Sequence, residues 1–372
     1  MTLNTRSVSA GDALEVLRAG WAAQRQGRLR ASYMLHGRPG VGKTEIVRQL
    51  ADELGAKLFD LRLTMIEPQD LRGLPYYDHE NRRMVWYRPE DLPDNPDQPS
   101  VLFLDELTAA PPALQPAVYG LLQERRVGPH RLPDSVFVVA AGNMAEDGAV
   151  AYEMGTALSD RLVHLHVVAA ASDWLKNYAV RAGLHPTVVA FIKTRPDLLE
   201  TTPAALQRGE VIAATPRSWE RVSQILNTEP TRHLRDVLIS GTVGEAIAAE
   251  FALLADEIAA NAQIADLLDA GTSERWALYP ASLHGLNAVV FGLIGALESA
   301  TVDNVVEVME GIRHLSRHRA EPEFGRIPLA ELCTYGFELL IQKALDDGLG
   351  KQFLANSAYQ SYASDRQAAG LE

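Results

Sequence analysis

The sequence predicts an α/β fold with a mostly parallel β-sheet in its N-terminal part and an α-helical region after it. Over residues 1–170, short apolar runs alternate with helical patterns, the arrangement of a parallel sheet covered by helices on both faces. One run, Val101–Leu104, has no polar residue, as expected of a strand buried on both faces. From about Ala171 onward the strand signals stop and helical stretches follow.

The first predicted strand, Ser32–Leu35, leads into a glycine-rich octapeptide and then a helix. Apolar residues recur at helical spacing from Ile46 to Leu54, and Gly55 is placed to cap the helix. The octapeptide matches G-x-x-x-x-G-K-T, a phosphate loop, and with the next residue it comprises Gly37, Arg38, Pro39, Gly40, Val41, Gly42, Lys43, Thr44 and Glu45.

Each part of this loop has a chemical reason to bind a nucleoside triphosphate. The glycines let consecutive backbone N–H groups point inward around the β- and γ-phosphates, and Lys43 adds a positive charge. The Thr44 hydroxyl is a ligand for Mg²⁺, and the helix adds its positive end. The alternative, a glycine-rich turn that only connects two elements, explains neither the lysine nor the threonine.

A second motif follows the apolar strand, where Asp105 and Glu106 come directly after Leu104. Strands of parallel sheets open onto a ligand crevice at their carboxyl ends. There Asp105 is placed to hold Mg²⁺, and Glu106 to orient and deprotonate the water that attacks the γ-phosphate. Alone, this run would equally suit a strand that ends in a solvated acidic turn.

Three more strands complete the predicted sheet: Lys57–Leu61, Val136–Ala140 and Val163–Val168. In the last of them His164 and His166 lie on one face, as a metal-binding pair would. No cysteine or third histidine is near them in sequence, so ordinary strand residues are the favoured interpretation.

Composition limits the classes of function. Lys and Arg number 35 against 48 Asp and Glu, and the net charge of −13 disfavours non-specific binding to nucleic acid or anionic membrane. The single cysteine, Cys333, suits a reducing compartment, and we expect a cytoplasmic protein. Met1–Leu14 has no signal-peptide core, and the apolar stretch Ala288–Leu297 is too short to span a bilayer.

With the two nucleotide motifs placed, further residues resemble the AAA+ ATPases, and the closest resemblance is to their MoxR-like branch, related to dynein-type modules. The segment Val136–Asn143 looks like the strand that ends in sensor 1, which implies that Asn143 positions the attacking water. Ser159-Asp160-Arg161 resembles the arginine-finger segment, so Arg161 would reach the neighbouring subunit's nucleotide. Thr215-Pro216-Arg217 resembles sensor 2, with Arg217 near the γ-phosphate.

Two predicted hairpins point to the same branch. Residues 76–87 and 124–133 resemble the inserts that, in ring-forming relatives, face the central pore and touch the substrate. The aromatic cluster of the first hairpin, Tyr76, Tyr77, Trp86 and Tyr87, also suits simple cross-strand packing, which needs no partner.

The resemblance implies an ATP- and Mg²⁺-dependent ring, a hexamer, that remodels a protein partner, such as one with a von Willebrand factor A domain. It predicts a core at residues 1–170, a helical lid at 171–260 and a helical extension of unknown role at 261–372. Two alternatives stay open: a nucleic-acid motor or restriction subunit, and a nucleotide-dependent assembly scaffold with little turnover.

Overall fold

The computed structural model describes residues 3–144, 147, 156–261 and 264–368. The chain divides into two compact units, each described here by itself. The first unit comprises Met1–Ala170, Thr202–Gly209 and Thr215–Arg217; the second comprises Ala171–Thr201, Glu210–Ala214 and Ser218–Glu372. The boundaries expected for a core, a lid and an extension stay predictions.

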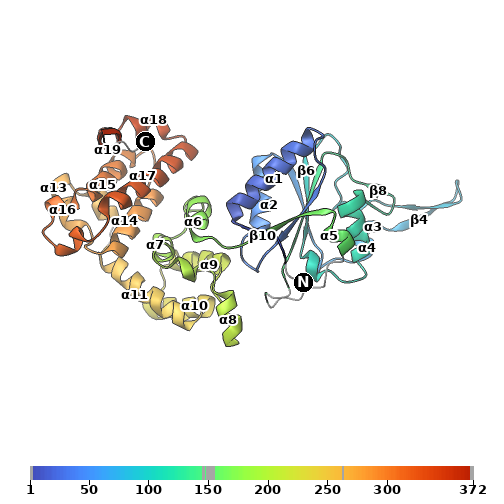
Figure 1. Ribbon diagram of the computed structural model, residues 1–372, viewed down its shortest axis with the longest axis horizontal. Helices are drawn as coiled ribbons and strands as arrows, with labels where there is room; N and C mark the ends of the chain where they lie inside the picture. The colour runs from blue at the N-terminus through green and yellow to red at the C-terminus, as the bar shows by residue number, and fades with distance from the viewer. Residues whose placement is uncertain (1–2, 145–146, 148–155, 262–263, 369–372) are drawn as a thin grey trace. The chain divides into compact units, whose positions relative to one another are not determined.

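A six-stranded parallel sheet forms the centre of the first unit (Figure 1). In spatial order its strands are β1 (Ser7–Val8), β10 (Leu162–Val167), β2 (Ser32–His36), β9 (Val136–Gly142), β6 (Ser100–Asp105) and β3 (Lys57–Arg62). The predicted parallel sheet is confirmed, and all five predicted strands are present with slightly different ends. The strand β1 was not predicted, because two residues are too few to show a periodic pattern.

Each central strand sends alternate side chains into two separate apolar cores. In β6, Val101 and Phe103 pack with helices α1 (Ala10–Arg25) and α2 (Lys43–Glu53), while Leu102 and Leu104 pack on the other face. That other face is covered by α3 (Pro68–Arg72), α4 (Gln115–Tyr119) and the π-helix η2 (Gly120–Glu124). Burial on both faces explains why the β6 sequence has no polar alternation.

Two antiparallel hairpins extend from the sheet, as the sequence predicts. Strands β4 (Pro75–Asp78) and β5 (Arg83–Trp86) form the longer hairpin, which projects away from the sheet in Figure 1. Strands β7 (Arg126–Val127) and β8 (His130–Arg131) form the shorter one, just before β9.

The described part of the second unit is helical, which confirms the predicted helical C-terminal region. An aromatic cluster of Phe191, Trp219 and Phe251, with ring centroids 5.2–5.7 Å apart, forms one core. The main helices are α7 (Pro186–Thr194), α9 (Pro216–Leu226), α10 (Arg232–Val243), α11 (Glu245–Asn261), α12 (Ile264–Asp269), α13 (Thr272–Leu278), α14 (Leu283–Gly295), α15 (Val302–Ile312), α17 (Leu329–Asp346), α18 (Gly350–Ala355) and α19 (Ser357–Ala368).

The most apolar of these helices, α14, is buried along most of its length by the second unit itself. Within the described residues, no helix combines the length and the apolar character needed to cross a membrane.

Candidate nucleotide-binding site

The phosphate loop connects the carboxyl end of β2 to the first turn of α2. Gly40 and Gly42 adopt φ angles of +82° and +100°, a region that side chains disfavour. A Cβ on Gly40 would also lie 2.8 Å from the Thr215 hydroxyl, so this loop needs glycine for space as well as for conformation. Within the loop, Val41 is buried in the α2-side core, whereas Pro39 and Glu45 are exposed.

The Lys43 ammonium is the centre of the site. It donates hydrogen bonds to the carbonyl oxygens of Gly37 at 2.6 Å and Arg38 at 3.0 Å, and to the Asn143 side-chain oxygen at 2.9 Å. Since β2 and β9 are neighbours in the sheet, the loop after one strand meets the residue after the other. The structure therefore brings together Lys43 and Asn143, which are far apart in sequence.

The electrostatic surroundings of Lys43 make its ammonium easier to deprotonate. Burial of the side chain lowers the pKa of Lys43 to about 8, against the opposing attraction of Asp105 and Asp147. The positive charge of Arg217 lowers the pKa further. A phosphate group in the loop would raise the pKa of Lys43 again, because it adds negative charge beside the ammonium.

Thr44 and Asp105 form the second part of the site. The Thr44 hydroxyl donates a hydrogen bond of 3.2 Å to Asp105 Oδ2, and Asp105 Oδ1 accepts one of 2.8 Å from the Glu106 backbone N–H. Asp105 is 8% exposed. A hydroxyl and a carboxylate at this distance are the hard oxygen ligands that Mg²⁺ prefers beside a phosphate, so the donor set fits this ion.

Glu106 has an unusual backbone. Its φ of +59° and ψ of +34° are left-handed, a conformation that costs a non-glycine residue about 1–3 kcal/mol and is concentrated at functional sites. Thr64 donates a hydrogen bond to Glu106 Oε2, and Arg62 Nε lies 3.8 Å from Oε1. The sequence did not indicate Thr64 and Arg62 as site residues. They lie here because β3 pairs with β6, and Arg62 is the register partner of Asp105.

The two predicted arginines lie in different surroundings. Arg217 is in the first turn of α9 and belongs to the first unit; its Cβ lies 3.5 Å from the point that a Cβ on Gly40 would occupy. Arg161 is exposed and donates a 2.6 Å hydrogen bond to Gln123 at the end of η2. Among the described contacts, Arg217 is thus placed beside the phosphate loop and Arg161 is not.

Arg38 makes a contact that the sequence did not indicate. Its Nε lies 3.2 Å from Asp147, whose carboxylate also accepts a 3.1 Å hydrogen bond from the Met144 backbone N–H. Asp147 is 5% exposed. The contact joins the phosphate loop to the segment that follows Asn143.

A histidine pair lies directly before the phosphate loop. His36 Nε2 and His164 Nδ1 are 2.8 Å apart, and the rings stack with centroids 5.1 Å apart. A third histidine therefore lies beside His164 in space although none is near it in sequence, because β2 and β10 pair in register. No cluster able to hold a metal occurs among the described residues, and His166 instead contacts the Ser7 hydroxyl.

The segment that carries this site is similar in sequence to known ATPases. Residues 32–164 match the model of the ATPase family associated with various cellular activities, AAA. The mouse and bovine ATPase family gene 2 protein homolog B are 39% and 37% identical over 102 residues, 27% of this chain and 11% of each relative. A RuvB mutant of Thermotoga maritima shares 16% identity at a TM-score of 0.37, over 82% of this chain and 90% of that one.

The loop geometry and the family match together define a nucleotide-binding domain at residues 32–164. Within these bounds the chain is similar to the AAA-type ATPases. The chain spans about a tenth of the length of the curated relatives that it matches.

The His36 pair predicts a stability loss in mild acid. Burial, helped by His164, His166 and Lys43, lowers the pKa of His36 from 6.5 to about 4. Below pH 6.5 the unfolded chain binds a proton at this position that the folded chain does not, so stability is complete above pH 6.5 and is lost as pH falls toward 4. Between pH 7.5 and pH 5 the loss is about 2 kcal/mol.

Urea unfolding at the two pH values measures this loss. The His36→Gln variant keeps a side-chain N–H for His164 but cannot titrate, so its stability should fall less. His233→Gln, at an exposed histidine of α10, is the matched control and should behave as the wild type. An equal acid loss in His36→Gln and wild type would contradict the prediction.

The lowered Lys43 pKa predicts that nucleotide binding takes up protons. At pH 8 about half of the Lys43 side chains are neutral in the free protein, and phosphate binding requires the ammonium. Calorimetric titration of ADP at pH 8, in two buffers of different ionisation enthalpy, should show an uptake of up to about half a proton. Lys43→Arg keeps the positive charge and should abolish the uptake; the same uptake in both proteins would assign it to another group.

Proposed function

We propose that the chain is a MoxR-like AAA+ ATPase that binds and hydrolyses ATP with Mg²⁺ in a ring and uses the energy to remodel or activate a protein partner. The observation that carries this proposal is the placement of Lys43, Thr44, Asp105 and Asn143 at one edge of the sheet, joined by hydrogen bonds of 2.9–3.2 Å. These are the residue types and contacts that phosphoryl transfer to water needs.

Each residue has a proposed part in the reaction. Lys43 exchanges its loop carbonyl partners for the β- and γ-phosphate oxygens, and Thr44 and Asp105 hold Mg²⁺, which offsets phosphate charge when bound. Glu106 would accept the proton of the attacking water, and Asn143 would orient that water. Arg217, beside Gly40, adds positive charge near the γ-phosphate.

The position of Arg161 supports an oligomer. Its side chain is exposed and bonded to Gln123, and it makes no described contact with the loop of its own chain. An arginine that acts on the neighbouring subunit's nucleotide completes that site only on assembly. We therefore propose a homo-oligomeric ring, and a hexamer as its size.

The β4–β5 hairpin supports a protein substrate. Tyr76 and Tyr87 stack at 4.3 Å, so part of the aromatic cluster does pack within the hairpin. Tyr77 and Met84 are nevertheless 52% and 63% exposed and are partners across the two strands. An exposed aromatic and apolar pair on a projecting hairpin suits contact with a polypeptide, including a partner with a von Willebrand factor A domain.

The same hairpin gives less support to a nucleic-acid substrate. The hairpin carries two arginines, Arg82 and Arg83, and Arg83 lies 3.5 Å from the carboxylate of Asp78. The net charge of −13 also opposes binding to a polyanion. A cytoplasmic location is part of the proposal, with the one cysteine, Cys333, buried as a free thiol.

The proposed role of Glu106 is tested by separating binding from turnover. Glu106→Gln keeps the size of the side chain and removes its basicity, so ATP binding should stay near the wild-type value and turnover should fall by about a hundredfold or more. Glu90→Gln, at an exposed glutamate, is the control and should keep full turnover. Full turnover in Glu106→Gln would remove this residue from the reaction, and lost ATP binding would make its role structural.

The proposed role of Arg161 is tested by mixing variants. Arg161→Ala should bind ATP but hydrolyse it poorly, and mixing it with Lys43→Ala should restore part of the turnover, because an intact site then meets an intact arginine across an interface. Gln123→Ala removes only the bond within the chain and should stay active. If Gln123→Ala were as inactive as Arg161→Ala, or if co-assembled mixtures showed no rescue, Arg161 would act only within its own chain.

A further inference from the structure

A cavity of about 240 Å³ lies within the second unit, in the region 261–372 for which the sequence suggested no role. Helices α13 and α15 form its walls, and the start of α19 contributes Ala358 at its edge. Its lining combines aromatic rings with charged groups of both signs: Arg275, Trp276, Tyr279, Glu307, Glu310 and His314. The volume is below that of most drug-sized sites and suits a molecule about as large as an amino acid.

The positive group of the cavity is only partly paired. Arg275 is 7% exposed, and its Nη1 donates a 2.8 Å hydrogen bond to Glu307. Its Nε–H is buried and has no hydrogen-bond partner in the described structure. Its Nη2 makes only a long 3.5 Å contact with the Leu268 carbonyl, so the guanidinium keeps donors for a carboxylate.

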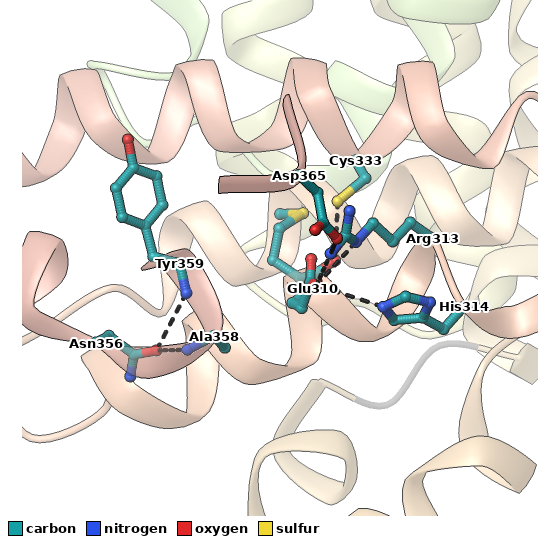
Figure 2. Close-up of polar contacts among 9 residues, drawn as sticks. Glu310, Arg313, His314, Cys333, Asn356, Ala358, Tyr359 and Asp365 are labelled. Atoms are coloured by element: carbon teal, nitrogen blue, oxygen red, sulfur yellow. Dashed lines mark hydrogen bonds and ion pairs between the residues drawn. The ribbon is translucent and has the colours of Figure 1, made fainter. Parts of the chain in front are cut away.

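The Glu310 carboxylate, the negative group of the cavity, lacks a hydrogen-bond donor for one of its oxygens. Glu310 is 8% exposed, and its Oε1 accepts a 2.8 Å hydrogen bond from Arg313 and lies 3.4 Å from His314 (Figure 2). Its Oε2 is buried without a partner in the part of the chain that is described. Buried polar atoms are nearly always hydrogen-bonded, so an unpaired donor and an unpaired acceptor at one cavity call for an explanation.

The aromatic wall is held in place by its own contacts. The Tyr279 hydroxyl donates a 2.6 Å hydrogen bond to the Val308 carbonyl, and the Trp276 ring stacks on His318 at 3.9 Å. A Cβ on Gly311 would lie 2.5 Å from the Tyr279 hydroxyl, so glycine lets this ring approach α15. The cavity thus has aromatic rings whose positions are fixed by contacts with neighbouring residues.

We propose that this cavity binds a small zwitterion of the free amino acid class, with a large apolar or aromatic side chain. Its carboxylate would accept from Arg275, its ammonium would donate to Glu310, and its side chain would lie against Trp276 and Tyr279. A simple cation would leave the Arg275 donor unpaired and be repelled by it, and a simple anion would be repelled by Glu307 and Glu310. Because Arg275 Nε and Glu310 Oε2 are buried, binding would require both side chains to rotate toward the ligand.

Three matched probes test this proposal by calorimetric titration of the full chain. L-Tryptophan carries both charged groups, tryptamine lacks the carboxylate, and indole-3-propionate lacks the ammonium. L-Tryptophan should bind saturably, and each of the other two should bind about tenfold more weakly or worse, because each leaves one charged group unpaired. No saturable binding of L-tryptophan at millimolar concentration, or equal binding of tryptamine, would overturn the proposal.

Two variants locate the binding. Glu310→Gln removes the charge that attracts the ammonium, and Ala358→Leu fills the edge of the cavity without changing any charge, so both should weaken L-tryptophan binding about tenfold or more. Arg326→Gln, an exposed arginine of the same unit, is the control and should bind as the wild type. If a folded Ala358→Leu variant bound L-tryptophan as tightly as the wild type, the cavity would not be the site.

Discussion

The hydrogen bonds of the Lys43 ammonium are the interaction on which the candidate site depends. They tie the first turn of α2 to the loop carbonyls of Gly37 and Arg38 and to Asn143 at the end of β9. A buried ammonium is stable only when such acceptors surround it. The lysine therefore links the phosphate loop to the residue that follows β9.

The parallel sheet makes this arrangement possible, because the carboxyl ends of neighbouring strands meet at one edge. The ends of β2, β9 and β6 supply the loop, Asn143, and the pair Asp105 and Glu106. The two neighbouring carboxylates have different partners: Asp105 contacts Thr44, while Glu106, with its left-handed backbone, contacts Thr64. Two adjacent acidic residues thereby contact different parts of the site.

Much of this fold and site could be predicted because the signals are local. The phosphate loop, the strand before it and the acidic pair are short contiguous patterns, and each lies where the sequence placed it. What was missed depends on contacts between distant segments: Thr64 at Glu106, His36 at His164, and Gln123 at Arg161. The cavity in the second unit also depends on distant segments, since Arg275 of α13 and Glu310 of α15 line it together.

The most direct test of the central claim is a crystal structure of the chain with Mg²⁺ and a non-hydrolysable ATP analogue. The account predicts that the Lys43 ammonium leaves the Gly37 and Arg38 carbonyls for the β- and γ-phosphate oxygens, with Mg²⁺ on Thr44 and beside Asp105. A nucleotide bound in the loop while Lys43 keeps both carbonyl partners, or bound elsewhere on the chain, would contradict it.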